Sequence, residues 1–212
     1  MDADFWHSKW EKNEIGFHQN KPNEMFTRHF HRLDLTPGAR VFLPLCGKTL
    51  DIGWLLSEGY AVAGAELNES AIRQLFEGLK LTPNITAAGP LIQYRAPGID
   101  IFVGDIFDLA ADRLGPIDAV YDRAALVALP TEMREKYAQH LPEITQAAPQ
   151  LLITLDYDQA EMKGPPFAID EAELRRLYSA AFQIDLLEEA DASGSLKKDI
   201  TVHQAAWHLR SR

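Results

Sequence analysis

The sequence predicts an α/β protein built on a doubly wound, mostly parallel sheet, and three observations lead to this expectation. Between residues 40 and 66, an apolar run from Val41 to Leu45 meets a tight turn at Gly47, and a helical stretch then leads to a second apolar run that ends on Glu66. Similar runs alternate with amphipathic stretches further along the chain, as in α/β folds. Near-continuous apolar segments such as 151–155 are typical of strands covered on both faces.

The elements can be placed in order from the same pattern. Two helices are expected before the alternation begins, over 4–14 and 23–33. The alternating part predicts strands at 40–45, 60–66, 99–104, 117–122 and 150–156, and helices at 48–58, 69–79, 131–141 and 170–181. Segments 91–95 and 99–103 flank a Pro-Gly turn and could form a hairpin. The terminal runs 183–189 and 199–209 predict an antiparallel hairpin that completes a seven-stranded sheet.

Length and composition indicate one globular domain over residues 1–212. The chain has 46% hydrophobic and 25% charged residues, as in soluble proteins. No apolar run approaches the roughly 20 residues that cross a bilayer, and the acidic start lacks the features of a signal peptide. The single cysteine, Cys46, cannot form an internal disulfide, so a cytoplasmic location is expected.

The net charge, and the absence of metal-binding and heptad motifs, exclude several classes of binding partner. A formal net charge of −10 repels phosphate backbones, which argues against nucleic acid as a substrate or partner. Binding to a membrane is not expected either. The histidines and the cysteine show no spacing typical of a metal site, so no metal is expected. No heptad pattern indicates an oligomerisation helix, and we therefore expect a monomer.

The turn at Gly47 is the first candidate binding element. It lacks the G-x-G-x-x-G pattern, and it is not a P-loop because Phe42 stands where the first glycine is required. Without a glycine-rich loop the turn is poorly suited to a triphosphate or a dinucleotide pyrophosphate. It favours a nucleoside ligand without phosphates, although an ordinary turn between strand and helix is an alternative.

Glu66 is the second candidate. It falls 19 residues after Gly47, close to the roughly 20 expected for a carboxylate that accepts hydrogen bonds from ribose hydroxyls. The alternative is a surface acid that caps the helix beginning near residues 68–70. The spacing from Gly47 favours the ribose interpretation.

Two further strands end on polar side chains. Asp105 and Ile106 follow one strand, where a polar group and an apolar group would suit the edge and face of an adenine ring. Arg123 ends another strand and should point into the crevice where ligands bind in such sheets. Its guanidinium could hold a carboxylate or a polarised heteroatom; a loop acid at 105 and a salt bridge from Arg123 to Asp122 are the alternatives.

Aromatic residues gather near the N-terminus. Trp6, Trp10 and Phe17 could pack the N-terminal helices onto the sheet, or their faces could attract a cationic ligand. We favour packing for Trp6 and ligand contact for Trp10. Cys46 beside the turn could be a nucleophile, but a lone cysteine is usually a small core residue, which we favour.

Together these motifs resemble one family. They are Trp6-x-x-x-Trp10, Phe17-His18-Gln19, Arg40-Val-Phe-Leu-Pro-Leu-Cys-Gly-Lys48, Val62-Ala-Gly-Ala-Glu66, Gly104-Asp-Ile-Phe-Asp108 and Asp122-Arg123-Ala-Ala-Leu126. They cover nearly the whole chain, and the sequence resembles the bacterial thiopurine S-methyltransferases. The resemblance implies a class I, Rossmann-like methyltransferase fold that uses S-adenosyl-L-methionine and yields S-adenosyl-L-homocysteine.

The resemblance also implies roles for particular residues. Trp10, Leu45, Glu66 and Arg123 should be the main cofactor contacts, with further contributions from Phe17, Gly47, Asp105 and Ile106. Residues 1–36 should form a helical lid. Our own hypothesis is that Arg123 also acts in catalysis by steadying the sulfur of a small-molecule thiol, because a guanidinium suits a delocalised anion. Selenium or tellurium compounds are further candidate acceptors. A nicotinamide-dependent oxidoreductase and a non-catalytic nucleoside-binding protein on the same fold are the alternatives.

Overall fold

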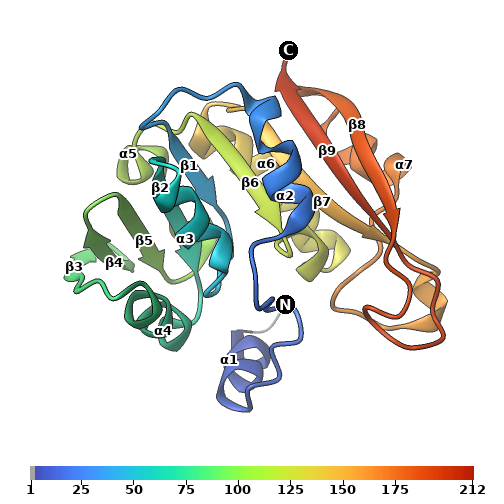
Figure 1. The fold of residues 1–212 in the computed structure, drawn as a ribbon, viewed down its shortest axis with the longest axis horizontal. Coiled ribbons are helices and arrows are strands. Elements are labelled where there is room, and N and C mark those ends of the chain that lie inside the picture. Colours follow the sequence, from blue (N-terminus) through green and yellow to red (C-terminus); the bar gives the residue numbers. More distant parts are fainter. Residues whose placement is uncertain (1–2) are drawn as a thin grey trace.

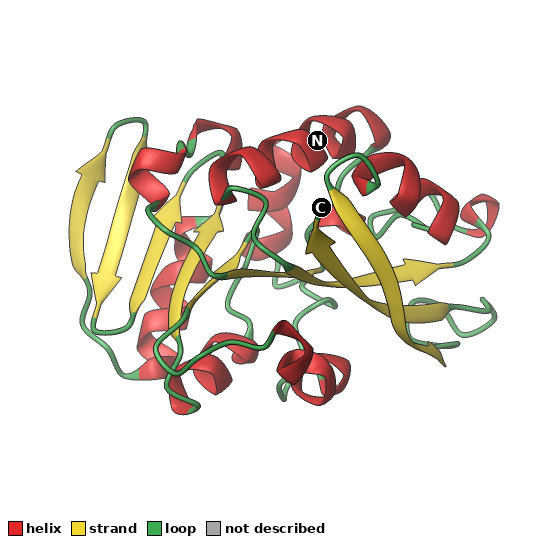
Figure 2. Ribbon diagram, turned by 90° about the horizontal axis from the view of Figure 1, so that it is seen from above, coloured by secondary structure: helices red, strands yellow, loops and turns green. Residues whose placement is uncertain are grey.

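The computed structural model describes residues 3–212 as helices packed on both faces of one sheet (Figures 1 and 2). The helices are α1 (Ala3–Glu11), α2 (Glu24–His29), α3 (Leu50–Ser57), α4 (Glu69–Leu79), α5 (Ala111–Leu114), α6 (Thr131–Thr145) and α7 (Glu171–Tyr178). The strands are β1 (Arg40–Leu43), β2 (Ala61–Glu66), β3 (Asn84–Ala88), β4 (Leu91–Ala96), β5 (Ile99–Val103), β6 (Ala119–Arg123), β7 (Gln150–Asp156), β8 (Phe182–Asp191) and β9 (His203–Ser211). Short 3₁₀ turns cover Phe30–Leu33, Ile106–Asp108, Leu126–Ala128 and Gln159–Glu161.

The sheet is doubly wound and mostly parallel at its centre, as the sequence predicts. Its order is β3-β4-β5-β2-β1-β6-β7-β9-β8, and β5, β2, β1, β6 and β7 are parallel neighbours. β8 and β9 form the expected antiparallel C-terminal hairpin. The expected number of seven strands is wrong: among the described residues the sheet has nine. The expected hairpin of 91–95 and 99–103 is confirmed as β4 and β5, and β3, which the sequence did not predict, pairs with β4 and forms the outer edge.

Alternation along β1 explains how the sheet separates two cores. Val41 and Leu43 point to the face covered by α2, α3 and α4, while Phe42 points to the face covered by α5, α6 and α7. All three side chains are at most 2% exposed. Successive side chains of a strand point to opposite faces, so an apolar run without alternation is what a doubly covered strand requires.

Local capping fixes where the site-bearing helices begin. The Thr49 side chain accepts a hydrogen bond from the backbone of Asp51 at the start of α3, and Asn68 accepts from Ser70 and Ala71 at the start of α4. Helix α6 continues four residues past its expected end at 141 and includes Pro142. A proline in a helix interior gives up one backbone hydrogen bond, and burial of Ile144 against the core favours the extra turn.

The N-terminal segment divides into an anchored part and an outlying part. The backbone N–H of Asn23 donates to Asp51 at 2.7 Å, and the ring of Phe26 stacks on Tyr121 with centroids 4.0 Å apart. Helix α2 is thereby fixed to the sheet, whereas α1 lies beyond the end of the central strands (Figure 1). Residues 1 and 2 of the expected lid lie outside the described residues.

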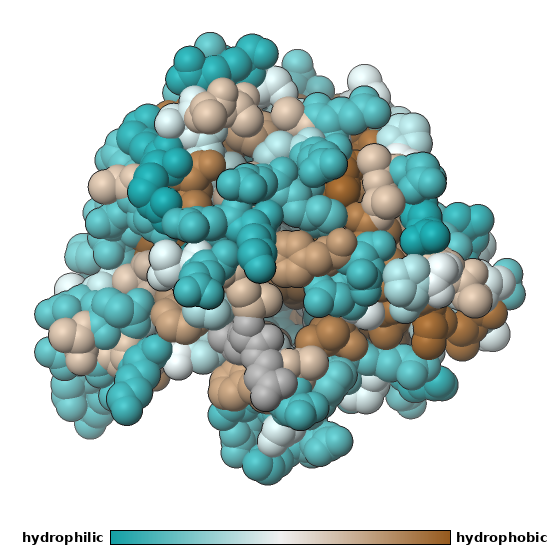
Figure 3. Space-filling view, turned by 180° about the vertical axis from the view of Figure 1, so that it is seen from behind, coloured by the Kyte–Doolittle hydropathy of each residue, from teal (hydrophilic) through white to brown (hydrophobic). Residues whose placement is uncertain are grey.

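Hydrophilic side chains cover much of the face shown in Figure 3, and groups of apolar side chains lie between them. Among the helices of residues 3–212, none combines the length and the apolar character needed to cross a bilayer.

Candidate active site

Four loops meet at one edge of the sheet. β5, β2, β1 and β6 are consecutive and parallel, so their carboxyl ends lie together. The chain leaves β1 toward α3 and leaves β6 toward α6, and these two helices cover opposite faces of the sheet. A crevice at such a change of winding direction is where ligands bind in doubly wound sheets. The loops bring Gly47, Glu66, Asp105 and Arg123 to this edge.

Glu66 ends β2 and is held by backbone hydrogen bonds. One carboxylate oxygen accepts from the N–H of Gly47 at 2.8 Å, and the other accepts from the N–H of Asn68 at 2.9 Å. Burial raises the pKa of Glu66, while these backbone N–H groups act in the opposite direction. A carboxylate has about four acceptor positions, so each oxygen can still accept from a ligand. The alternative role as a helix cap belongs to Asn68 instead.

The turn after β1 approaches Glu66 in a strained conformation. Leu45 and Gly47 both have positive φ angles, of 45° and 52°, and the N–H of Cys46 donates to the carbonyl of Ala65 at 3.0 Å. A glycine adopts such angles without penalty, whereas Leu45 does so at some cost in free energy. This turn directs backbone N–H groups toward the end of β2.

The aromatic residues of the N-terminal segment pack over the same turn. Trp10 is only 7% exposed, and its ring lies so close to Gly47 that an added Cβ would be 3.2 Å from Cζ2. The Trp10 and Phe17 rings meet edge to face at 5.7 Å, and Trp6 meets Phe17 at 5.9 Å. The ammonium of Lys48 lies 5.9 Å from the centroid of Trp10. Trp10 therefore contacts the turn, while Trp6 packs behind Phe17.

Two cations near the lid have no acidic partner. Lys48 donates to the amide oxygen of Gln74 at 2.7 Å, and within residues 3–212 neither Lys48 nor Arg123 forms an ion pair with a carboxylate. Burial and the nearby charges of Lys48 and Arg123 lower the pKa of His18. The alternative salt bridge from Arg123 to Asp122 is not formed. In a chain with net charge −10, unpaired cations at a crevice favour an anionic ligand group.

Asp105 and Ile106 lie in the adjacent loop. The N–H of Gly104 donates to the carbonyl of Glu66 at 2.9 Å, which joins this loop to the end of β2. Asp105 is exposed and accepts from the N–H of Phe107, while Ile106 is buried and its carbonyl is bonded by His140 at 2.9 Å. An exposed acid beside a buried apolar residue is consistent with the expected contacts of Asp105 with the edge and Ile106 with the face of an adenine ring. These contacts stay predictions.

Cys46 is a core residue in this structure. It is 8% exposed, and burial, followed by the charge of Glu66, raises the pKa of its thiol well above the ordinary value. A thiol kept protonated is a poor nucleophile. Among the described residues, no group of three His, Cys, Asp or Glu side chains is arranged to hold a metal ion.

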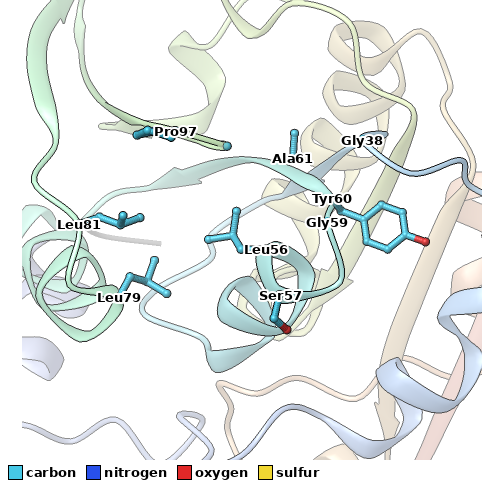
Figure 4. A pocket seen from close by; sticks show the side chains of 10 residues that line it. Gly38, Leu56, Ser57, Gly59, Tyr60, Ala61, Leu79, Leu81 and Pro97 are labelled. Atoms are coloured by element: carbon cyan, nitrogen blue, oxygen red, sulfur yellow. The ribbon is translucent and has the colours of Figure 1, made fainter.

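A separate hollow lies at the opposite edge of the sheet. It is formed where the chain enters β1, β2 and β5, and it is shallow and mainly apolar (Figure 4). It is lined by Gly38, Leu56, Ser57, Gly59, Tyr60, Ala61, Leu79, Leu81, Pro97 and Gly98. None of the residues singled out from the sequence lies there.

Sequence reasoning did not assign roles to three residues that the structure places near the site. Lys48 lies over the ring of Trp10, and His18 is near enough to Lys48 and Arg123 to feel their charges. The ring of His7 on α1 forms a hydrogen bond with the side chain of Asn68 at 3.1 Å. His18 and Lys48 both stand in motifs that were recognisable in the sequence. The hydrogen bond between His7 and Asn68 joins positions 61 residues apart, and no local sequence motif indicates it.

The fold and the crevice define a class I, S-adenosylmethionine-dependent methyltransferase. Solved structures of similar shape include the magnesium protoporphyrin IX methyltransferase of Synechocystis with bound S-adenosylhomocysteine, at TM-score 0.61 and 16% identity over 99% of this chain and 98% of that one. A TehB-like S-adenosylmethionine-dependent methyltransferase from Corynebacterium glutamicum has TM-score 0.57 and 13% identity over 98% of both chains. At these identities the likeness concerns the fold alone.

Sequence comparison is more specific. The family model described as thiopurine S-methyltransferase matches residues 1–211, and the chain belongs to this family. The thiopurine S-methyltransferase of Xanthobacter autotrophicus is 50% identical over 210 residues, covering 99% of both chains. That of Acinetobacter baylyi is 44% identical over 100% of both. The resemblance predicted from the motifs is therefore confirmed.

Proposed function

We propose that this methyltransferase moves the methyl group of S-adenosylmethionine to the sulfur of aromatic or heterocyclic thiols such as thiopurines. Selenium and tellurium compounds are further candidate acceptors. One observation carries the assignment of the cofactor site: the carboxylate of Glu66 is fixed by Gly47 and Asn68 at the carboxyl edge of the sheet, beneath a cover of aromatic rings. The family match supports the reaction class.

The residues at this edge suit each part of the cofactor. Glu66 would bond the ribose hydroxyls, and the backbone from Leu45 to Gly47 would lie along the methionine portion. Asp105 and Ile106 would flank the adenine. Lys48 and Arg123, which have no carboxylate partner among residues 3–212, supply positive charge for the methionine carboxylate or an anionic acceptor. The turn lacks phosphate-binding glycines, which agrees with a nucleoside that carries no phosphate.

The chain's contribution to the reaction is alignment and the exclusion of water. When bound, S-adenosylmethionine supplies an electrophilic methyl group on a sulfonium. Trp10 and Phe17 would cover the reacting atoms, and a dry pocket favours the approach of a soft thiolate. The guanidinium of Arg123 would steady the sulfur of the acceptor, since a planar cation suits a delocalised anion. Holding the acceptor in line with the methyl group supplies several kcal/mol of the barrier.

Within the expected lid, residues 1–36, the moving part in this scheme would be α1 and the loop that follows it, because α2 is fixed to the sheet. Glu66 and Trp10 are each 7% exposed, and α1 is tied to the Glu66 loop through His7 and Asn68. A nucleoside can reach Glu66 only after α1 and the loop that follows it have moved. Such a lid would close over the bound cofactor and seal the crevice from solvent.

Two alternatives can be tested against this proposal. A nicotinamide-dependent oxidoreductase would need a phosphate-binding glycine loop, which the turn at Gly47 does not provide. A non-catalytic nucleoside-binding protein would keep the crevice without the reaction. Neither is favoured by the family match.

Two measurements separate the three functions. The chain is incubated with methyl-labelled S-adenosylmethionine and 6-mercaptopurine, and label should appear in the methylated product. Thermal shift is then compared for S-adenosylhomocysteine and NAD, and only the former should raise the melting temperature. Binding without transfer to any thiol would favour the non-catalytic protein, and stabilisation by NAD alone would favour the oxidoreductase.

We also propose a cytoplasmic location and a monomeric state. The lone cysteine requires no oxidising compartment. The acidic charge gives no attraction for nucleic acid or an anionic membrane surface. Fractionation of expressing cells would test the location.

A further inference from the structure

Asp122 is a buried carboxylate next to Arg123 at the end of β6, and it faces away from the crevice. Its side chain is fully buried and points to the face covered by α6, where it accepts from the hydroxyl of Tyr137 at 2.6 Å. Its other oxygen accepts from the backbone N–H of Leu126 at 3.2 Å. Because alternate residues of a strand point to opposite faces, Arg123 projects to the other side, toward the loop that contains His18.

The backbone that follows Asp122 and Arg123 and leads to Leu126 is strained. Ala124 has a φ of 64°, a left-handed conformation that costs free energy for any residue with a Cβ. The hydrogen bond from Leu126 to Asp122 closes the turn over Ala124 and compensates for this strain. Tyr137 in turn fixes the carboxylate to α6, so the turn is connected to the body of the protein through Asp122.

From this geometry we propose that Asp122 is a positioning residue: its buried carboxylate holds the turn at residues 123–126 so that Arg123 faces the cofactor and acceptor. This inference rests on the proposed function, which gives Arg123 its ligands. Asp122 itself touches neither ligand and acts only through the backbone.

Burying the charged carboxylate of Asp122 costs free energy of folding, which supports a functional reason for an acid at this position. Burial raises the pKa of Asp122 to about 6, although hydrogen bonds from Tyr137, Leu126 and Ala125 oppose the shift. The ordinary value is 3.8, so the folded chain binds this proton more tightly than the unfolded chain. The resulting stabilisation is complete below the unfolded pKa and is lost as the pH rises through about 6. At pH 7 the ionised carboxylate therefore lowers stability.

The surroundings of Asp122 contain few other groups that could account for a pH effect. Tyr137 from α6 and Tyr178 from α7 face it, and the neighbouring strand β7 places apolar Leu152 opposite it. Tyr121, on the other face of the same strand, also responds to its charge. The tyrosines have raised pKa values, so Asp122 is the group of this cluster that titrates between pH 4 and 7.

The two tyrosines provide a matched pair of variants. Y137F and Y178F remove the same atom from the same cluster, but only the Tyr137 hydroxyl bonds Asp122. The Tyr178 hydroxyl is buried, and no hydrogen-bond partner for it is found among the described residues. A role for Asp122 in holding the turn predicts that only Y137F weakens ligand binding.

The experiment measures the affinity for S-adenosylhomocysteine and the melting temperature in the full chain, from pH 4 to pH 8. D122N should weaken affinity at pH 7 about tenfold and Y137F about threefold, as expected for lost hydrogen bonds to a charged group, while Y178F should match the wild type. At pH 7 the melting temperature of D122N should not be lower than that of the wild type. As the pH rises from 4 to 6, the melting temperature should fall less in D122N than in the wild type. A second arm combines D122N with R123K, and the two effects should be less than additive because they act through one side chain.

Several outcomes would overturn the inference. These are binding by D122N within twofold of the wild type, full additivity of the effects of D122N and R123K, and a loss of affinity in Y178F equal to that in Y137F. If D122N does not fold, the two tyrosine variants decide the question alone. A wild-type chain that does not bind S-adenosylhomocysteine would contradict the proposed function itself, which is a different result from equal binding by the wild type and D122N.

Discussion

At the scale of single residues, Glu66 has the most specific geometry at the candidate site. Both of its oxygens are already oriented by backbone N–H groups, of Gly47 and Asn68, before any ligand arrives. This arrangement costs no side-chain reorganisation when ribose hydroxyls bind, and preorganisation of this kind favours affinity.

Replacing Glu66 tests this geometry. We expect Glu66→Ala to weaken the affinity for S-adenosylhomocysteine by about 1–3 kcal/mol, the usual magnitude for hydrogen bonds to a charged group. Glu66→Gln keeps one acceptor oxygen and should lose less. Titration calorimetry measures both, with Glu58→Ala, an exposed acid after α3, as the control. Equal affinity in all four proteins would remove Glu66 from the ribose site.

Arg123 gives a second prediction at this scale. Arg123→Lys keeps the charge but loses the planar fork, so we expect kcat to fall or the acceptor KM to rise about tenfold, roughly 1.4 kcal/mol. Steady-state kinetics with 6-mercaptopurine measures the change. Arg95→Lys, on the exposed side of β4, serves as the control. Unchanged kinetics in Arg123→Lys would exclude the proposed contact with sulfur.

At the scale of elements, α1 and α2 differ in how firmly they are held. α2 has buried Met25 and Phe26 in the core, whereas Trp10 is the one buried residue of α1. Segments with few buried contacts open locally at low free-energy cost. The boundary between the two helices, near residues 12–22, is therefore where the lid should move.

Limited proteolysis tests this boundary. Lys12 is exposed and is followed by Asn13, so trypsin should cut after Lys12 before it cuts the body of the chain, whereas Pro22 blocks cleavage after Lys21. S-adenosylhomocysteine should slow the cleavage by closing the lid. Trp10→Ala should abolish most of this protection because Trp10 contacts the turn at Gly47. Trp6→Ala, which loses only its packing against Phe5 and Phe17, is the matched control. Cleavage rates that do not respond to the ligand would contradict a lid.

The parallel elements were predictable because burial on both faces leaves a strong local signal. The missed strand β3 has an exposed or partly exposed side chain at every position, so neither an apolar run nor alternation marks it. Pro142 suggested an end to α6 that the packing of Ile144 overrides. Competition between local propensity and tertiary packing explains both differences.

The candidate site also has a part that the sequence predicts and a part that it does not. Gly47, Glu66, Asp105 and Arg123 follow apolar strands, so topology alone places them at one edge of the sheet. The contacts that hold them connect distant parts of the chain: Tyr137 bonds Asp122 across the fold, and His7 bonds Asn68. Pairings of this kind depend on three-dimensional packing and leave no spacing that a sequence could reveal.

At the scale of the whole molecule, net charge and sheet edges bear on association. The formal charge of −10 gives copies of the chain a mutual repulsion. The outer strand β8 carries several acidic side chains, as exposed edges of natural sheets often do, whereas β3 has no charged residue and no buried position. We expect a monomer of 23.8 kDa, and sedimentation equilibrium at several concentrations checks this. A stable dimer at low concentration would contradict the expectation.

The order of strands in the sheet also bears on how the protein is made. β9 follows β7 and β8 in the chain and pairs with both of them. Until β9 has been synthesised and released from the ribosome, β7 lacks its neighbour on one side and β8 has none, so both expose unpaired backbone groups that can recruit other chains. A nascent or prematurely terminated chain that ends before His203 would therefore be prone to aggregation, even though every residue of the proposed catalytic crevice had already been made.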